Sequence, residues 1–384
     1  MPNGADHALA AVVRPIEEAH GLPNAHYIDK GVFAAERDAL FFRTWAAIGF
    51  GKDVPNAGDA MPITFLGVPL LAVRDRDGTL RVFQNTCRHR GMILVEEPTS
   101  IRGAIRCPYH SWAYALDGAL RSTPHVGGSG QNSHPCINKK DLGLFEIRSF
   151  VWNDVIFVNL DGKAPPFEEH AAALIERWKE FDQPLYHPGA DSSFTLEVNC
   201  NWKLAVENYC ESYHLPWVHP GLNSYSKLED HYHIEAPGHF SGQGTLVYRP
   251  MIDESGHNFE AFAGLSEKWD SAGEYIALYP NLLFGVHRDH VHAILLEPVS
   301  QSKTIERVEI YYANDAMRTS EWAGMRAANT RLWRGVFEED VFVVEGMQRG
   351  RYGTQFDGGK FAPAMDGPTH CFHHWVATQM MRPA

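Results

Sequence analysis

The chain has 384 residues, of which 44% are hydrophobic and 21% charged, and its formal net charge is −13 at pH 7. The acidic balance argues against binding to nucleic acid or to anionic membrane surfaces. No run of about 18 apolar residues is available to span a membrane, and the N-terminal segment lacks the basic start of a secretory signal. Six cysteines are too few for a disulfide framework in so long a chain, so we expect a protein of the cytoplasm. The length predicts two domains, because a single core rarely grows beyond about 250–300 residues.

The first part of the chain predicts a helical segment followed by a small β domain. Residues 1–43 mix apolar and charged side chains, and we expect a helical lead-in that packs on the second domain. Short alternating apolar runs follow, which predict antiparallel strands over residues 44–162. Pairs of turn residues separate these strands and indicate hairpins: Asp77-Gly78, Asp117-Gly118 and Asn153-Asp154.

The rest of the chain, residues 163–384, predicts strands with packed helices. Such an order favours an α+β domain over a βαβ wrap. A strand running into a longer helix is expected over 192–214, and the other predicted helices cover 170–181, 317–346 and 372–381. Long strands are expected over 274–287, 290–300 and 304–315.

Two cysteines and two histidines stand in an unusual pattern in the first domain. Cys87 and His89 form Cys-x-His, and after seventeen residues Cys107 and His110 form Cys-x-x-His. Two thiolates and two imidazoles can hold a [2Fe–2S] cluster, with the sulfurs on one iron and the histidines on the other. A structural zinc site is the alternative, but zinc motifs usually pair ligands of one kind. The interleaved pattern favours the cluster.

A second metal site is predicted in the segment 201–220. We expect Pro216 to end the helix just after His214, since proline cannot continue it. The resulting bend would bring His219 back alongside His214. Two histidines and one carboxylate form the ligand set of many non-haem Fe(II) oxygenases. The alternative is that both histidines are hydrogen-bonded core residues.

The carboxylate of this second site is predicted in a later helix. Trp333, Phe337 and Val344 mark the buried side of that helix, and Asp340 lies on the same side. A lone aspartate among core-facing positions needs a cationic partner. Glu339 is the competing candidate, and Glu338 is a weaker one.

Other histidines gather in three groups without a carboxylate at a convincing spacing. We expect them to line the surface or a pocket and not to bind metal. The groups are His231 with His233, His287 with His290 and His292, and His370 with His373 and His374.

Three motifs carry a family resemblance: CRHRG…CPYHSW, then NWK…ENYCESYH with a following histidine, and a late ED…QRG. Together they resemble the large (alpha) subunit of Rieske non-haem iron oxygenases. The resemblance runs from about residue 35 to the C-terminus. It implies an N-terminal all-β Rieske [2Fe–2S] domain over 44–162. For residues 163–384 it implies a helix-grip, START-like catalytic domain with an antiparallel sheet.

The resemblance also implies cofactors and partners. Each chain would hold one [2Fe–2S] cluster on Cys87, His89, Cys107 and His110, and would use O2 on a small-molecule substrate. The mononuclear Fe(II) would be held by His214, His219 and Asp340. Electrons would come from NAD(P)H through a separate reductase or ferredoxin, since the chain has no glycine-rich dinucleotide fingerprint.

A head-to-tail homotrimer is a further implication of the family. In it, Glu211 would carry electrons from His110 of one subunit to His214 of the next. A carboxylate hydrogen-bonded to both imidazoles would fix their orientation and couple the two centres.

Two positions depart from the family pattern. Ser111 stands where glycine is usual, which is tolerable if the backbone there is not left-handed. Glu211 stands where aspartate is more common, and this is reminiscent of the branch that oxidises carnitine and glycine betaine. Aromatic rings that could surround a trimethylammonium group are Trp217, Tyr225, Tyr232, Phe284 and Trp333.

Three functions stay open at this point. Oxidative N-demethylation of a quaternary ammonium compound is the first, and hydroxylation of an aromatic ring by mono- or dioxygenation is the second. The third is a Rieske electron-transfer protein without oxygenase activity. A zinc-stabilised binding module is a more distant alternative.

Overall fold

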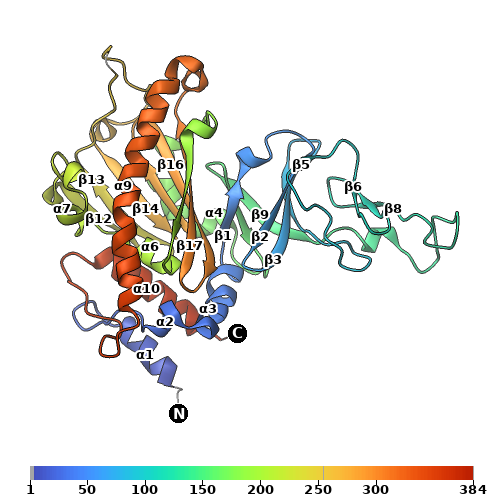
Figure 1. Cartoon of the computed structure of the whole chain (residues 1–384), viewed down its shortest axis with the longest axis horizontal. Coiled ribbons are helices and arrows are strands. Elements are labelled where there is room, and N and C mark those ends of the chain that lie inside the picture. The colour runs from blue at the N-terminus through green and yellow to red at the C-terminus, as the bar shows by residue number, and fades with distance from the viewer. Residues whose placement is uncertain (1–3, 254, 384) are drawn as a thin grey trace. The chain divides into compact units, whose positions relative to one another are not determined.

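The computed structural model describes residues 4–253 and 255–383. It divides into two compact units, one with the residues up to Ala46 and from Pro165 onward, the other spanning Ala47–Ala164. The helical lead-in therefore belongs to the same unit as the C-terminal part of the chain (Figure 1). No helix in the described ranges has the length and apolar content to cross a bilayer.

The unit Ala47–Ala164 is built from two antiparallel sheets. In the described residues the larger sheet has the order β1-β10-β9-β4-β3-β2-β5, and the smaller has the order β6-β7-β8. The bounds of the larger sheet are β1 Ala46–Phe50, β2 Asp59–Phe65, β3 Val68–Arg74, β4 Leu80–Gln84, β5 Thr99–Ser100, β9 Glu146–Trp152 and β10 Val155–Asn159. Those of the smaller are β6 Ile105–Arg106, β7 Ala113–Tyr114 and β8 Leu120–Ser122.

The predicted hairpin turns are confirmed. Asp77-Gly78 lies between β3 and β4, Asp117-Gly118 between β7 and β8, and Asn153-Asp154 between β9 and β10. Asn153 and Asp154 both have positive φ, 48° and 63°, as a type I′ turn requires. Loops at the strand ends carry Cys87 and Cys107, which pack into the core of this unit.

The other unit is organised around an antiparallel sheet of the order β11-β17-β16-β15-β14-β13-β12. Its strands are β11 Ser193–Val198, β12 His231–Ala236, β13 Phe240–Thr245, β14 Gly273–Leu278, β15 Leu282–Val286, β16 His290–Ser300 and β17 Lys303–Tyr312. The long helix α9 (Ala323–Gly350) runs along this sheet and contacts β11 and α6 (Trp202–Tyr209) (Figure 1). This is the helix-grip arrangement.

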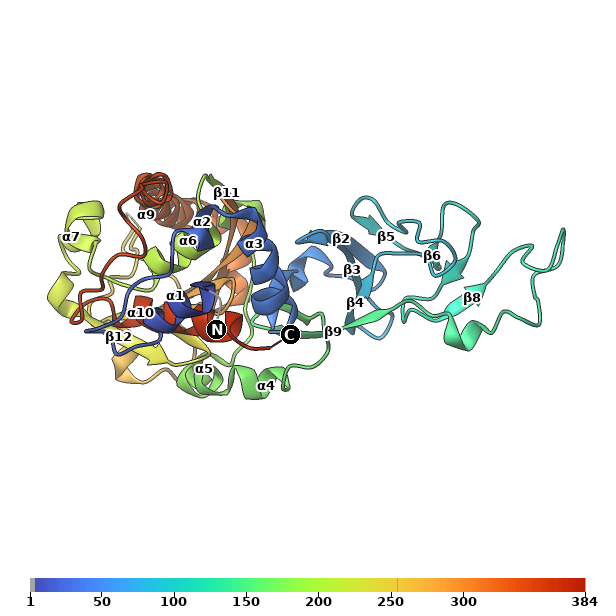
Figure 2. The same ribbon diagram turned by 90° about the horizontal axis from the view of Figure 1, so that it is seen from below.

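Shorter helices complete this unit. The helix α10 (Gly367–Met380) packs against β12 and β13, and α1 (Gly4–Val12) packs against α10, as the view from below also shows (Figure 2). The remaining α-helices are α2 Ala25–Ile28, α3 Lys30–Glu36, α4 Phe167–His170, α5 Ala172–Arg177, α7 Leu215–Val218 and α8 Pro220–Asn223.

Two expectations about secondary structure are wrong. The segment 274–287 is not one strand but the hairpin β14–β15, because Pro280 has no amide hydrogen to donate to a sheet and the chain turns there. The helix that begins at Trp202 ends at Tyr209, well before His214.

Candidate metal centres and the pocket beside them

The four cysteine and histidine candidates of the β unit come together on two neighbouring loops. Cys87 and Cys107 are buried, and the rings of His89 and His110 lie 4.8 Å apart between centroids. Trp112 supports this arrangement, because its ring stacks on His89 at 4.9 Å. The two loops thus present one thiol and one imidazole each to a shared space.

The chemistry of these side chains fits a cationic cofactor. Burial raises the pKa of the Cys87 thiol, and the neighbouring Cys107 raises it further. Burial lowers the pKa of His89, and His110 lowers it further. Nδ1 of His110 is buried and has no hydrogen-bond partner among the described residues. Buried thiols and unpaired imidazole nitrogens that face each other are suited to binding iron, so these four residues would hold the cluster.

The backbone at Ser111 does not meet the condition under which serine would be tolerated in place of glycine. The backbone there is left-handed, with φ 57°, and the Ser111 amide donates to the Cys107 carbonyl at 3.0 Å. A side chain at positive φ is strained by roughly 1 kcal/mol relative to glycine. The tight turn of the loop that carries Cys107 and His110 therefore keeps its shape at a local energetic cost.

The second predicted site is assembled as a cluster of three ligand atoms. One nitrogen each of His214 and His219 and one oxygen of Asp340 all lie within 4.8 Å of one another. Oδ1 of Asp340 is 3.0 Å from Nε2 of His219 and 3.6 Å from Nε2 of His214. The rings of the two histidines are 5.1 Å apart between centroids.

Each histidine is oriented by a second carboxylate. Nδ1 of His214 lies 2.5 Å from Oε1 of Glu211, and Nδ1 of His219 lies 2.7 Å from Oε2 of Glu339. An ionised carboxylate can only accept a hydrogen bond, so both rings carry their proton on Nδ1. In the neutral form of both rings, the lone pairs of the Nε2 atoms therefore point toward Asp340.

The unpaired side-chain atoms of this cluster are suited to binding a metal ion. Oδ1 of Asp340 is buried and has no hydrogen-bond partner among the described residues, even though Nε2 of His219 is close to it. Two nitrogen lone pairs and an anionic oxygen that face one another repel unless a cation lies between them. His214, His219 and Asp340 would thus hold the mononuclear iron, which supplies the activation of O2 when it is bound.

Glu339 and Glu338, the alternatives to Asp340, have other partners. Glu339 accepts from His219, and Glu338 forms an exposed ion pair with Arg334 at 2.8 Å. The outer carboxylates on His214 and His219 are the usual way of fixing the tautomer of a metal-binding imidazole.

The path of the chain around His214 differs from the expected one. Glu211 accepts hydrogen bonds from the amides of Tyr213 and His214, so the chain turns after α6 and does not extend it. Pro216 lies in the first turn of α7, where its missing amide hydrogen costs no hydrogen bond. Glu211 thus caps the turn between α6 and His214, and the single helical turn of α7 (Leu215–Val218) joins His214 to His219. Tyr213, in the turn that Glu211 caps, is exposed.

A pocket of about 990 Å³, open to solvent, adjoins the three ligand residues. Most of its wall is aromatic or apolar, with His231, Gln243 and Arg249 among the polar lining residues. The lining rings are Tyr209, Tyr225, Tyr248, Tyr275, Trp333 and Phe337.

The expected aromatic residues are only partly placed in this pocket. Tyr225 and Trp333 line it, whereas Trp217 is 71% exposed. The hydroxyl of Tyr232 donates to Glu274 at 2.9 Å, and the ring of Phe284 packs against Trp178. No periodic pattern singled out Tyr248, because it lies in the irregular segment after β13.

The other histidines have ordinary partners. His231 lines the pocket and contacts Gln243 at 2.6 Å and Ser226 at 3.0 Å. His373, expected at a surface or a pocket, is instead buried 3.1 Å from Glu207. His233, His370 and His374 line a second depression.

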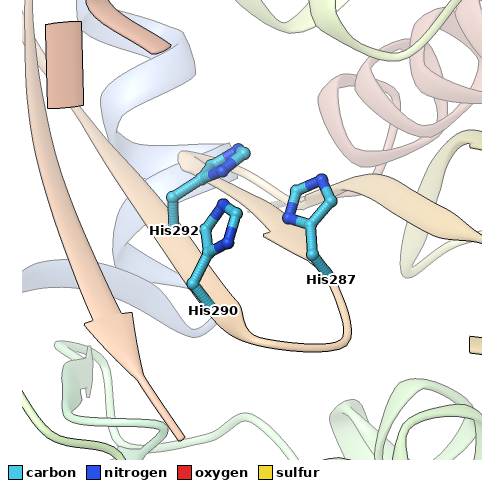
Figure 3. Close-up of side chains that lie close together, drawn as sticks. All are labelled: His287, His290 and His292. Atoms are coloured by element: carbon cyan, nitrogen blue, oxygen red, sulfur yellow. The ribbon is translucent and has the colours of Figure 1, made fainter. Parts of the chain in front are cut away.

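The group of His287, His290 and His292 is fully buried at the β15–β16 turn (Figure 3). It was expected at the surface or in a pocket, and of the three His290 lines the pocket. Both ring nitrogens of His290 are engaged, Nδ1 with Asp289 and Nε2 with Trp333. One nitrogen of each of the three rings lies within 4.8 Å of the others, and Nδ1 of His287 and of His292 has no hydrogen-bond partner among the described residues, but His290 has no free lone pair to offer a metal.

Comparison with known families gives a match in each part of the chain. Residues 44–138 match the Rieske [2Fe-2S] domain, and residues 175–382 match the catalytic domain of the ring hydroxylating alpha subunit. The chain is a member of this family of Rieske oxygenases. It is accordingly the terminal oxygenase subunit of a system that uses a [2Fe–2S] cluster and a mononuclear iron.

Several relatives cover most of the chain. The carnitine monooxygenase oxygenase subunit of Escherichia coli K12 is 27% identical over 87% of this chain and 85% of its own length. The chloroplastic choline monooxygenase of Arabidopsis thaliana is 25% identical over 94% and 82%. The fold is shared with the quaternary ammonium Rieske monooxygenase CntA, at a TM-score of 0.76, 23% identity and 98% of each chain. Naphthalene 1,2-dioxygenase from Rhodococcus sp. gives the same TM-score at 18% identity, again over 98% of each chain.

Proposed function

We propose that this oxygenase hydroxylates an N-methyl group of a small quaternary ammonium compound. The hydroxymethyl product is a hemiaminal, which loses formaldehyde and leaves the amine with one methyl group fewer. Hydroxylation of an aromatic ring is the alternative, since an aromatic substrate also suits an apolar pocket.

The single observation that carries the proposal is the composition of the pocket. Six aromatic rings surround a space next to His214, His219 and Asp340. The faces of tyrosine and tryptophan rings attract a desolvated trimethylammonium group by cation–π interaction. Each ring contributes about 0.5–2 kcal/mol of binding free energy. The names of the relatives, carnitine and choline monooxygenases, point to the same class of substrate.

The roles of the chain's own residues follow from their contacts. His214, His219 and Asp340 hold the iron. Glu211, which accepts from Nδ1 of His214 at 2.5 Å, is the bridge for electrons that arrive from His110. We propose a homotrimer in the cytoplasm in which this His110 belongs to the cluster of a neighbouring subunit, and a separate NAD(P)H-dependent reductase or ferredoxin reduces that cluster.

The structure also favours an oxygenase over a simple electron carrier. A carrier would need the four cluster residues alone, whereas the catalytic domain adds a convergent ligand set with an unpaired buried carboxylate oxygen. Analysis of the purified protein tests this. About three irons and two sulfides per chain are expected; two irons would indicate a carrier, and zinc alone a binding module.

Turnover with a surrogate reductase tests the substrate class. Carnitine, glycine betaine, choline and a set of aromatic acids would each be supplied, with formaldehyde and oxygenated products measured against NAD(P)H consumed. Formaldehyde in step with NAD(P)H consumption is the expected result. A phenol or a cis-dihydrodiol from an aromatic acid, without formaldehyde from any ammonium compound, would favour the alternative.

A further inference from the structure

A buried carboxylate stands directly behind the aromatic wall of the pocket. Asp289 is 0% exposed and lies in the turn between β15 and β16. It accepts a hydrogen bond from the Tyr248 hydroxyl at 2.9 Å and another from Nδ1 of His290 at 2.7 Å. Tyr248 and His290 both line the pocket, so Asp289 is one residue removed from the substrate space.

The hydrogen bonds around His290 fix its charge. The indole N–H of Trp333 lies 2.8 Å from Nε2 of His290, and an indole nitrogen can only donate. Nε2 must therefore accept, which leaves the single ring proton on Nδ1, where it is donated to Asp289. The hydrogen-bond geometry thus gives the His290 ring one proton and makes the Asp289 carboxylate its acceptor.

The neighbouring histidines add no positive charge. Burial lowers the pKa of His287 and of His292 well below the ordinary value, and nearby imidazoles lower it further. The rings of His287 and His290 are stacked with their centroids 4.5 Å apart. The three histidines lie close together (Figure 3), but both nitrogens of His290 are already engaged by Asp289 and Trp333. In the part of the chain that the structure describes, no lysine or arginine forms an ion pair with Asp289.

A buried charge without a cationic partner is costly, even when it accepts hydrogen bonds. Burial and the charge of Asp289 raise the pKa of Tyr248 well above its ordinary value, so this hydroxyl stays protonated and donates. Both lining residues thus direct their acidic hydrogens to Asp289 and away from the pocket. The surface that Tyr248 and His290 present to a ligand is therefore electron-rich.

We propose that Asp289, acting through Tyr248 and His290, is the counter-charge that positions a cationic substrate group in the pocket. This inference rests on the proposed function and deepens it. The aromatic faces alone already favour a trimethylammonium group over an uncharged tert-butyl group of the same shape, by cation–π attraction. A negative charge on Asp289, behind these rings, adds to the preference for the cation. The attraction between the two opposite charges is only weakly screened in a partly dry site.

Binding of charged and uncharged isosteres to the iron-loaded holoenzyme tests this without turnover. Choline is paired with 3,3-dimethylbutan-1-ol, and γ-butyrobetaine with 5,5-dimethylhexanoate, with affinities from titration calorimetry. The wild-type protein is expected to prefer the cation of at least one pair by tenfold or more. Equal affinity within both pairs would overturn the proposal and needs no variant.

Substitution assigns the preference to Asp289. Asp289→Asn keeps the shape and an acceptor for His290, and it is expected to lower the affinity for the cation about tenfold while the isostere changes less than twofold. Asp270→Asn is the matched control, since Asp270 is an exposed carboxylate paired with Arg288 and its loss should change neither affinity. Cluster absorption and iron content show that each variant is folded.

The two proposals fail in different ways. Formaldehyde release with an unchanged cation preference in Asp289→Asn would overturn the role of Asp289 and leave the proposed function in place. Oxidation of aromatic acids alone, with no ammonium compound bound, would overturn both.

Discussion

Oε2 of Glu339 lies 2.7 Å from Nδ1 of His219. The next residue in the chain, Asp340, faces the other nitrogen of the same ring, Nε2, at 3.0 Å. Two consecutive carboxylates thus act on opposite sides of one imidazole. Glu339 orients the ring, and Asp340 would complete the proposed metal site.

This division of roles gives the first prediction. Asp340→Ala should lower the iron content from about three to about two per chain, because a ligand is lost. Glu339→Gln should keep three irons but weaken the affinity for the mononuclear iron about 10–100-fold, since outer partners tune ligation. Iron analysis before and after brief chelation measures both. Equal iron loss in the two variants would mean that Glu339 is itself a ligand.

The second prediction concerns Glu211. Glu211→Gln removes the charge but leaves an acceptor for His214, so both metal centres should remain filled. Turnover should fall by two orders of magnitude or more if electrons cross this carboxylate. Reduction of the cluster by dithionite should be unchanged, which separates the effect from a damaged cluster.

Glu229 offers a matched control for that experiment. Its side chain is 73% exposed, so Glu229→Gln changes the net charge equally and should not alter turnover. Normal turnover in Glu211→Gln would show that the bridge is elsewhere.

The strained turn at Ser111 gives a third prediction. Ser111→Gly relieves a left-handed residue and should stabilise the β unit by about 0.5 kcal/mol or less, after the greater freedom of glycine in the unfolded chain is subtracted. The midpoint of urea denaturation, followed by the visible absorption of the cluster, should rise. Ser111→Ala keeps the strain and should give no gain; an equal gain from alanine would assign the effect to the lost hydroxyl.

The fourth prediction is a pH dependence of stability. Burial lowers the pKa of His170 to about 4, and His239 lowers it further. In the unfolded chain this histidine takes up a proton below about pH 6.5, whereas the folded chain does so only near pH 4. Stability is therefore lost as the pH falls from about 6.5 toward 4, by up to about 3 kcal/mol from this one group.

Variants separate His170 from other titrating groups. His170→Gln should flatten the change in unfolding free energy across that range, as measured by urea denaturation at several pH values. His257, with a side chain that is 70% exposed, is the control, and His257→Gln should leave the profile unchanged. An unaltered slope in His170→Gln would contradict the assignment.

Arg249 gives the fifth prediction, which rests on the proposed function. Its exposed guanidinium lines the pocket and lies 4.9 Å from the centroid of the Tyr225 ring. A carboxylate at the far end of a zwitterionic substrate would be attracted to it, so Arg249→Gln should raise the KM for carnitine or glycine betaine about five- to tenfold. The KM for choline, which has no carboxylate, should change little or fall. A similar rise for all three would assign Arg249 to pocket shape.

The sequence by itself determined the two domains, the hairpins of the β unit and the identity of the metal-ligand candidates. Cysteine and histidine at short spacings, and turn pairs such as Asn153-Asp154, carry local chemistry that does not depend on distant parts of the chain. Asp340 could also be proposed, with Glu339 as its competitor, because a helix repeats its buried face every three to four residues.

Only the tertiary structure decided which groups complete each site. Glu339 could not be separated from Asp340 by periodicity, since the ring of His219, 120 residues earlier in the chain, accommodates both carboxylates. Asp289, Tyr248 and Trp333 come from a strand turn, an irregular loop and a helix, and their hydrogen bonds form across elements. Long-range packing sets the charge behind the pocket, and no local pattern in the sequence encodes it.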